Sequence, residues 1–194
     1  MARYKGLSFY EKKKKISKEM IREIFDTIFS CFTAVLIAFV LVFSFGMKIS
    51  VIGVSMEPEL YNGQEVLVDR FSYKLLSPKR GDIVAFLPNG NKNSHYYLKR
   101  VVGLPGETVQ IIGGYVYVDG VLLEEDESYD KIADPGIAET QITLGTDEYF
   151  VLGDNRNNSE DSRSGNIGAV KKDNITGKAW FHLGCEEATM DFVK

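Results

Sequence analysis

The chain begins with a polar, basic stretch, continues as a long apolar run and then changes to short apolar segments between polar turns. The apolar run extends from Thr27 to Met47, 21 residues without a charged side chain. At about 1.5 Å per residue, a helix of this length spans roughly the 30 Å hydrocarbon core of a bilayer. The pattern predicts a membrane anchor over residues 25–47, preceded by a basic tail over residues 1–24.

Beyond Lys48 the apolar runs are short and rich in β-branched residues, which is typical of an all-β domain. Gly113-Gly114 and Asp119-Gly120 fall between such runs and predict tight hairpins. Residues 48–194 are therefore expected to be mainly β, with a coiled, partly closed antiparallel sheet. The predicted strands are 65–69, 83–87, 96–102, 108–112, 115–118, 148–152 and 175–182.

One segment of this domain, residues 124–141, does not follow the strand pattern. It is acidic, contains Pro135-Gly136 and shows no clear period. Such composition predicts a surface excursion or a flexible loop. Whether it contacts lipid, substrate or nothing is left open by the residues alone.

Charge is distributed unevenly along the chain. Residues 1–24 hold 8 of the 23 Lys and Arg but 3 of the 27 Asp and Glu, so this head carries +5 and the remainder −9. The positive-inside rule places the head in the cytoplasm and the domain after Lys48 on the outer face of the cell membrane. Because no basic and aromatic face accompanies the head, we expect contact with anionic lipid and no binding of nucleic acid.

A cleaved secretory signal is the alternative to a retained anchor. Ser44-Phe45-Gly46 has the small-x-small pattern of a processing site. However, both the basic head and the apolar run are longer than those of a typical signal, in which the apolar part has about 7 to 15 residues. We therefore expect the segment to be retained as a single-pass anchor.

The cysteines and histidines exclude some kinds of chemistry. Cys31 lies in the apolar run and Cys185 in the exported domain, so no intrachain disulfide is expected. The only histidines, His95 and His182, are not part of a cluster with the spacing of zinc ligands. We expect no metal and no cofactor.

Ser55 is the first candidate for chemistry. It lies directly beyond the anchor, between Gly53, which permits an unusual backbone, and Pro58, which stiffens the following turn. Taken alone, such a serine is by default an ordinary turn hydroxyl. Because Glu57 stands where the Gly-x-Ser-x-Gly elbow has its second glycine, a nucleophilic Ser55 would need its base from elsewhere.

Lys99 is a candidate for that base. In a strand it shares a face with Tyr97 and Val101, where burial could lower the pKa of its amine. Lowering this pKa by two or three units requires about 3 to 4 kcal/mol. A surface lysine with its stem along the strand is the alternative interpretation.

The third candidate is the dense polar loop Gly153–Arg163, which follows the strand ending at Leu152. It could be a solvated turn or a weak cation site, although a calcium loop would need a terminal Glu and flanking helices that are absent. A buried loop this polar must satisfy its own hydrogen bonds. Asp161 and Arg163 are therefore expected to form an internal ion pair.

Four segments together resemble the type I signal peptidase family, in the small, single-anchor form of Gram-positive bacteria. They occur in the family's order behind an anchor of the right polarity, and the resemblance covers residues 25–181. The segments are Ser55-Met56-Glu57-Pro58-Glu59-Leu60, Arg80-Gly81-Asp82-Ile83-Val84, Lys99-Arg100-Val101-Val102-Gly103-Leu104-Pro105-Gly106-Glu107 and Gly153 to Arg163.

The resemblance implies a Ser-Lys protease that cuts signal peptides from exported proteins after an Ala-x-Ala-like motif. Ser55 would be the nucleophile and Lys99 the neutral general base. Ser159 corresponds to the serine that orients the lysine amine. Asp161 and Arg163 match the structural ion pair of the family, and Asp154 is a further supporting acid.

The chain departs from the family pattern at three positions. Gly53 stands where some members have a serine that stabilises the oxyanion, so the Ser55 backbone N–H is expected to take this role. Glu59 replaces a usual threonine and Glu107 a usual aspartate, so the local hydrogen bonds are expected to differ from those of the family. The short region 107–148 implies that the larger accessory β-domain of the family is mostly missing.

Two other functions fit parts of the pattern. A self-cleaving repressor can share a Ser-Lys pair and a related β-fold, but it would carry a DNA-binding head instead of an apolar span. An inactive binding module tethered to the membrane would not need catalytic residues, whereas this chain contains all those that the reaction requires. Both are less consistent with the sequence than a signal-peptide protease.

Overall fold

The computed structural model describes residues 17–125, 129–186 and 188–193. The chain divides into two compact units, residues 1–40 and 41–194. A single α-helix, α1 (Lys18–Phe45), runs from the first unit into the second, and residues 18–43 are apolar and long enough to cross a membrane. The helix begins earlier than the predicted anchor, and it ends before Met47 because this residue already belongs to a strand.

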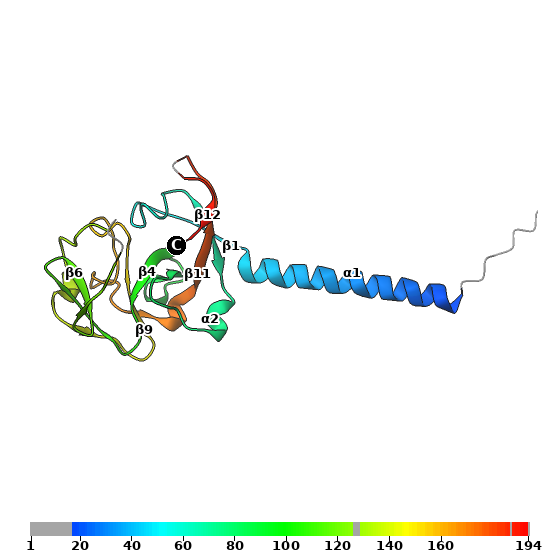
Figure 1. The fold of residues 1–194 in the computed structure, drawn as a ribbon, viewed down its shortest axis with the longest axis horizontal. Helices are drawn as coiled ribbons and strands as arrows, with labels where there is room; N and C mark the ends of the chain where they lie inside the picture. Colours follow the sequence, from blue (N-terminus) through cyan, green and yellow to red (C-terminus); the bar gives the residue numbers. More distant parts are fainter. Residues whose placement is uncertain (1–16, 126–128, 187, 194) are drawn as a thin grey trace, which may run out of the picture. The chain divides into compact units, whose positions relative to one another are not determined.

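The larger sheet of the β domain has eight antiparallel strands and is drawn in Figure 1. Seven follow the order β1-β2-β11-β3-β4-β9-β10, and β12 pairs with β11. Strand β11 is central, since it pairs with β2, β3 and β12. The bounds are β1 Met47–Ser50, β2 Glu65–Asp69, β3 Ile83–Phe86, β4 Tyr97–Gly103, β9 Glu148–Leu152, β10 Val170–Lys171, β11 Ile175–His182 and β12 Asp191–Phe192.

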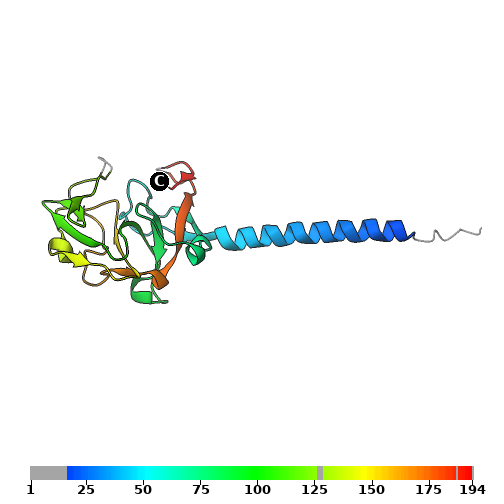
Figure 2. The same cartoon turned by 60° about the horizontal axis from the view of Figure 1, so that its bottom comes forward.

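A second, four-stranded antiparallel sheet has the order β7-β6-β5-β8. Figures 1 and 2 both show it, coloured green to yellow, on the other side of the domain from β11. The two predicted hairpins are confirmed, because β5 pairs with β6 and β6 with β7. The bounds are β5 Thr108–Ile112, β6 Tyr115–Val118, β7 Val121–Leu122 and β8 Ile142–Thr143.

The described connecting segments contain four short helices. The α-helix α2 (Ser72–Leu75) follows β2, and three 3-10 helices lie in later connections. Asp69 begins the turn into α2 by accepting the backbone N–H groups of Phe71 and Ser72. The 3-10 helices are η1 Pro88–Gly90, η2 Gly136–Glu139 and η3 Lys172–Asn174.

The core is built on both faces of the larger sheet. Alternate residues of β3 enter different clusters, with Ile83 and Ala85 in one and Val84 and Phe86 in the other. This alternation follows from the two-residue period of a strand and leaves all four residues of β3 buried. A third cluster, which includes Val102 of β4, joins the two sheets.

The predicted fold class, mainly β with antiparallel pairing, is confirmed. All seven predicted strands are present, five with the predicted bounds and two shifted by a residue at one or both ends. The sequence prediction missed β1 and the four strands of two residues each, and it expected one sheet where the structure has two. It was also incomplete for residues 124–141, because Ile132 and Ala138 are buried in the core; residues 126–128 of that segment lie outside the described residues.

Gly177 of β11 lies in close contact with the end of β2. A Cβ at this position would overlap the backbone carbonyl of Asp69. We predict that Gly177→Ala lowers the free energy of unfolding by about 1 to 3 kcal/mol, measured by denaturant unfolding in detergent. Gly165→Ala is the matched control, since its nearest neighbouring atom would be 3.9 Å away; equal stability of both variants would contradict the packing argument.

Candidate active site

Ser55 lies on the loop that connects β1 to β2. The base of this loop is closed by hydrogen bonds from the Val51 N–H to the Gln64 carbonyl and from the Gly63 N–H to the Val51 carbonyl. Met56 is buried in the core and anchors the centre of the loop. The loop therefore presents Ser55, which is partly exposed, next to a buried anchor.

Gly53 shapes the approach to the serine. Its φ of 82° lies in the left-handed region that side chains disfavour, and its N–H donates to Asn62 Oδ1 at 2.8 Å. Because this N–H is already engaged, Gly53 does not supply a free main-chain donor to the site. The Ser55 N–H has no acceptor among the residues that the structure describes.

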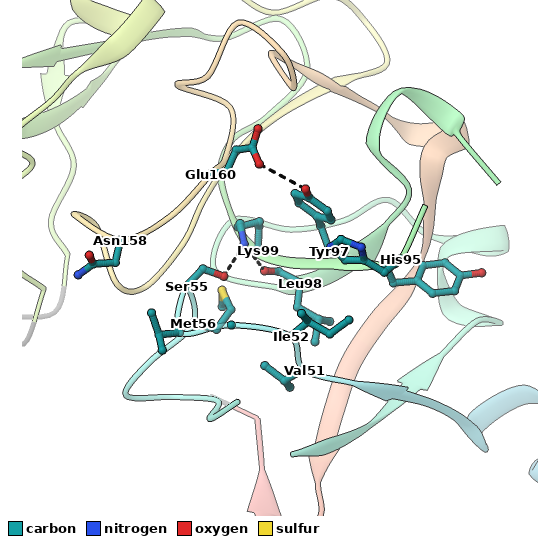
Figure 3. A pocket seen from close by; sticks show the side chains of 13 residues that line it. Val51, Ile52, Ser55, Met56, His95, Tyr97, Leu98, Lys99, Asn158 and Glu160 are labelled. Atoms are coloured by element: carbon teal, nitrogen blue, oxygen red, sulfur yellow. Dashed lines mark hydrogen bonds between the residues drawn. The ribbon is translucent and has the colours of Figure 1, made fainter. Parts of the chain in front are cut away.

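Lys99 lies on β4, and its side chain is buried with 4% of the residue exposed. Its Nζ donates to Ser55 Oγ at 2.6 Å and to the Leu98 carbonyl at 3.1 Å, as Figure 3 shows. The amine lies 5.5 Å from the centre of the Tyr97 ring, which agrees with the predicted shared face. The fold thus brings together two residues that are 44 positions apart in the chain.

Burial lowers the pKa of the Lys99 amine from 10.5 to about 8. Desolvation is the largest cause, since it penalises the charged form of the amine. The negative charges of Asp161, Asp154 and Glu160 oppose this effect and raise the pKa, while Arg163 lowers it. A useful fraction of the amine is therefore neutral near pH 8.

The polar loop Gly153–Arg163 holds the serine loop in place. The backbone N–H of Asn155 donates to the Ser55 carbonyl at 3.1 Å, and its side-chain Nδ2 donates to the Val54 carbonyl at 3.1 Å. One asparagine thus fixes two consecutive peptide groups around the serine. Asn155 was not singled out by sequence reasoning, although it lies within the predicted loop.

Three arginine–carboxylate pairs fasten this loop to its surroundings. Asp161 and Arg163 form the predicted ion pair through two hydrogen bonds of 2.8 Å. Asp154 pairs with Arg100 of β4, the neighbour of Lys99, at 2.6 and 2.7 Å. The third pair joins Arg156 to Glu125.

The Arg156–Glu125 pair connects the polar loop to the acidic segment that lacked a predicted role. Arg156 is 2% exposed, and its guanidinium makes two 2.7 Å hydrogen bonds to Glu125. It also lies 4.3 Å from the centre of the Tyr129 ring. Glu125 carried no recognisable motif in the sequence, so its role could be found only from the fold.

Ser159 is half-buried, and its Oγ is buried without a hydrogen-bond partner within the described residues. The structure does not contain the expected hydrogen bond between this hydroxyl and Lys99, whose amine is directed to Ser55 and Leu98. Ser159 instead packs against Gly153, where a Cβ would collide with its side chain. The glycine is required there by this close approach.

Ser55 and Lys99 line a pocket of about 200 Å³. Val51, Met56 and Leu98 form apolar parts of its wall, as Figure 3 shows. The ladder between β4 and β9 begins at Arg100, so the preceding residues of β4 are unpaired on that side within the described sheet. An extended peptide could therefore lie beside β4 and reach the serine.

Glu160 is an acidic residue at the same pocket that sequence reasoning did not select. Its Oε2 accepts a hydrogen bond from the Tyr97 hydroxyl at 3.3 Å, and the His95 ring stacks on Tyr97 at 4.9 Å. No ion pair involves Glu160 within the described parts of the chain. Its charge therefore acts on the pocket and on Lys99.

Glu107 departs from the family pattern but has its own partners. It accepts a hydrogen bond of 2.6 Å from Arg80 and one of 2.7 Å from the Leu104 N–H. Arg80 also donates to the Val102 carbonyl. The longer carboxylate thus keeps this turn hydrogen-bonded.

The residues described by the structure contain no group of three or more Cys, His, Asp or Glu side chains that could hold a metal ion. The chemistry available at the pocket is that of a hydroxyl, an amine and the surrounding charges. Such a pair fits the class of serine hydrolases in which lysine takes the place of histidine.

Comparison with known proteins places the chain among serine peptidases. Residues 24–183 match the family model of signal peptidase, peptidase S26. The chain therefore belongs to this family of serine peptidases, whose members are membrane-anchored.

The matched region covers a different share of each relative's length. A probable signal peptidase I-2 from Synechocystis is 41% identical over 130 residues, which is 65% of this chain and 57% of that protein. Signal peptidase I P from Bacillus subtilis subsp. natto is 36% identical over 155 residues, 74% of this chain and 82% of that one. A crystal structure of a signal peptidase I from Enterococcus faecalis is 35% identical, covers 53% of this chain and 97% of its own, and has a TM-score of 0.41.

Burial of the Lys99 amine should make the free energy of unfolding depend on pH. The pKa of Lys99 is lower in the folded state than in the unfolded state, so the unfolded chain binds more protons between pH 8 and 10.5 and stability rises with pH across this window. The full depression corresponds to a cost of about 3 kcal/mol below pH 8. We predict that Lys99→Met abolishes this rise.

The measurement is the free energy of unfolding of the full chain in detergent at pH 7 and pH 10. Lys92→Met is the control, because Lys92 is exposed and its replacement should leave the rise unchanged. A rise of equal size in the Lys99→Met variant would contradict burial of a titrating amine.

Proposed function

We propose that this protein is a membrane-bound serine endopeptidase that removes N-terminal signal peptides from exported proteins. Ser55 acts as the nucleophile and Lys99 as the general base. The observation that carries this proposal is the 2.6 Å contact between Lys99 Nζ and Ser55 Oγ, at a site where burial brings the pKa of the amine to about 8. Membership in the signal peptidase family supports the same reaction.

In the first step, the neutral amine of Lys99 accepts the proton of the Ser55 hydroxyl while Oγ attacks the scissile carbonyl. The Ser55 N–H, free of other acceptors in the described residues, donates to the resulting oxyanion. The tetrahedral intermediate collapses as the Lys99 ammonium protonates the leaving amine. This step releases the mature chain and leaves an acyl ester on Ser55.

In the second step, Lys99 takes a proton from water, and the hydroxide attacks the ester. Collapse of this intermediate returns the proton to Ser55 Oγ and releases the signal peptide. The Lys99 amine donates to Ser55 and Leu98 in this structure, so Ser159 is proposed to orient the amine only after it has accepted the proton, through an Oγ that is buried without a partner within the described residues. Its role is therefore greatest when Lys99 carries a proton.

The shape of the pocket supports cleavage after small side chains. Its volume is about 200 Å³, and the wall residues Met56 and Leu98 are themselves packed in the core. Enlarging the pocket would displace core side chains, which costs free energy. An Ala-x-Ala motif fits because its side chains require little of that space.

The anchor determines where the reaction takes place. The basic residues before α1 favour a cytoplasmic N-terminus, so the domain from residue 48 onward faces the exported side. Signal peptides span the same bilayer and present their cleavage sites there. The proposed topology thus gives the enzyme and its substrate a common surface.

Replacing either member of the pair tests the mechanism. We predict that Ser55→Ala and Lys99→Ala each reduce kcat/KM for an Ala-x-Ala precursor by about 1,000-fold or more, because each removes a group that acts in the transition state. The measurement is precursor cleavage in detergent, with thermal unfolding to verify the fold. Lys92→Ala is the control, and substantial cleavage by the Lys99→Ala variant would remove the proposed base.

The pH dependence tests the state of the amine. Since Lys99 must be neutral in the free enzyme, kcat/KM should rise with pH through an apparent pKa of about 8. Glu160→Gln should move this rise to lower pH, because the Glu160 charge raises the pKa of Lys99. The exposed Glu139→Gln variant is the control, and a profile that Glu160→Gln leaves unmoved would contradict the assignment.

A further inference from the structure

A basic pocket lies beside the point where the chain leaves the apolar helix. Strand β1 begins two residues after α1 ends, and its first residue, Met47, pairs with Val68 near the end of β2. Neighbouring strands are about 4.8 Å apart, so the chain that follows β2 continues past the end of the helix. The segment concerned contains Arg70 and α2.

The side chains around α2 suit the boundary of a bilayer. Leu75 and Leu76 are 73% and 59% exposed, and Phe71 is also exposed. The Arg70 guanidinium lies 5.6 Å from the centre of the Phe43 ring, at the end of the span and within the same compact unit. At a membrane interface, apolar side chains typically enter the acyl-chain region while a neighbouring cation stays at the level of the headgroups.

The pocket next to these side chains has a volume of about 600 Å³. Three cations line it, Arg70, Lys74 and Lys172, together with one acid, Asp173. None of the three cations forms an ion pair within the described residues. The Lys172 amine donates to the neutral Ser77 hydroxyl at 3.1 Å.

Asp173 is the one acid of the lining, and two further acids near the pocket are engaged by other groups. Asp69 accepts hydrogen bonds from the turn into α2, and Asp82 pairs with Lys178 and accepts the Tyr73 hydroxyl. The pocket therefore keeps an excess of positive charge, although the chain after residue 24 carries a net charge of −9. A local excess of this sign in an acidic domain favours an anionic ligand.

We propose that this pocket binds the headgroup of an anionic phospholipid, such as phosphatidylglycerol, in the leaflet next to the domain. The phosphate contacts Arg70, Lys74 and Lys172, and the acyl chains lie along Leu75 and Leu76. The lipid orients the domain on the membrane that holds its anchor. The inference rests on the proposed membrane topology but does not require the Ser55–Lys99 pair to be catalytic.

The test is native mass spectrometry of the full chain in detergent, with equal amounts of phosphatidylglycerol and phosphatidylcholine. The double variant Arg70→Gln/Lys74→Gln should weaken retention of one phosphatidylglycerol by about 25-fold, because each cation near anionic lipid contributes roughly a factor of five. The matched control Lys92→Gln/Lys131→Gln should retain that lipid as the native chain does. Both pairs lie outside the active site, so precursor cleavage in detergent should be unchanged and verifies the fold.

Two results would overturn the proposal. One is equal retention of phosphatidylglycerol by the native chain and the Arg70→Gln/Lys74→Gln variant. The other is displacement of the lipid by millimolar inorganic phosphate, which would identify a site for free anions. The same measurement on Lys99→Ala separates this inference from the catalytic one, because loss of cleavage should leave lipid retention unchanged.

Discussion

The site depends on keeping one amine away from water. Lys99 lies in a strand that is held between β3 and β9, and the surrounding core excludes solvent from its side chain. This desolvation opposes the charged form at a cost of about 3 kcal/mol below pH 8. Without it, the amine would stay protonated at neutral pH and could not accept a proton from Ser55. The packed sheet therefore makes the chemistry possible.

The charges near Lys99 determine how far burial lowers the pKa of its amine. Burial lowers the pKa of the amine, whereas Asp154, Asp161 and Glu160 raise it. Asp154 and Asp161 are each paired with an arginine, whose positive charge reduces the effect of the carboxylate on the pKa of the Lys99 amine. A pKa of about 8 is the balance between an apolar environment and a polar loop, and a change on either side shifts the pH at which the base is neutral.

The arginine–carboxylate pairs also give the polar loop a single geometry. Buried pairs contribute little net stability compared with apolar packing, but removing one partner leaves an uncompensated charge. The pairs Asp161–Arg163, Asp154–Arg100 and Glu125–Arg156 join the loop to itself, to β4 and to the acidic segment. Asn155 of this loop then holds the Ser55 backbone in place through the hydrogen bond from its N–H to the Ser55 carbonyl. The serine loop is thus held by residues far away in the chain.

The sequence by itself determined the local features, because they depend on near neighbours: the apolar span, seven strands, two hairpins and the Asp161–Arg163 pair, whose members are two residues apart. Only the tertiary structure decided the rest. The division into two sheets, the contact of Ser55 with Lys99 and the pairing of Arg156 with Glu125 depend on how strands cross and which faces they bury. The lowered pKa of Lys99 also depends on the tertiary structure, because the segments that exclude solvent from its amine are distant from it in the sequence.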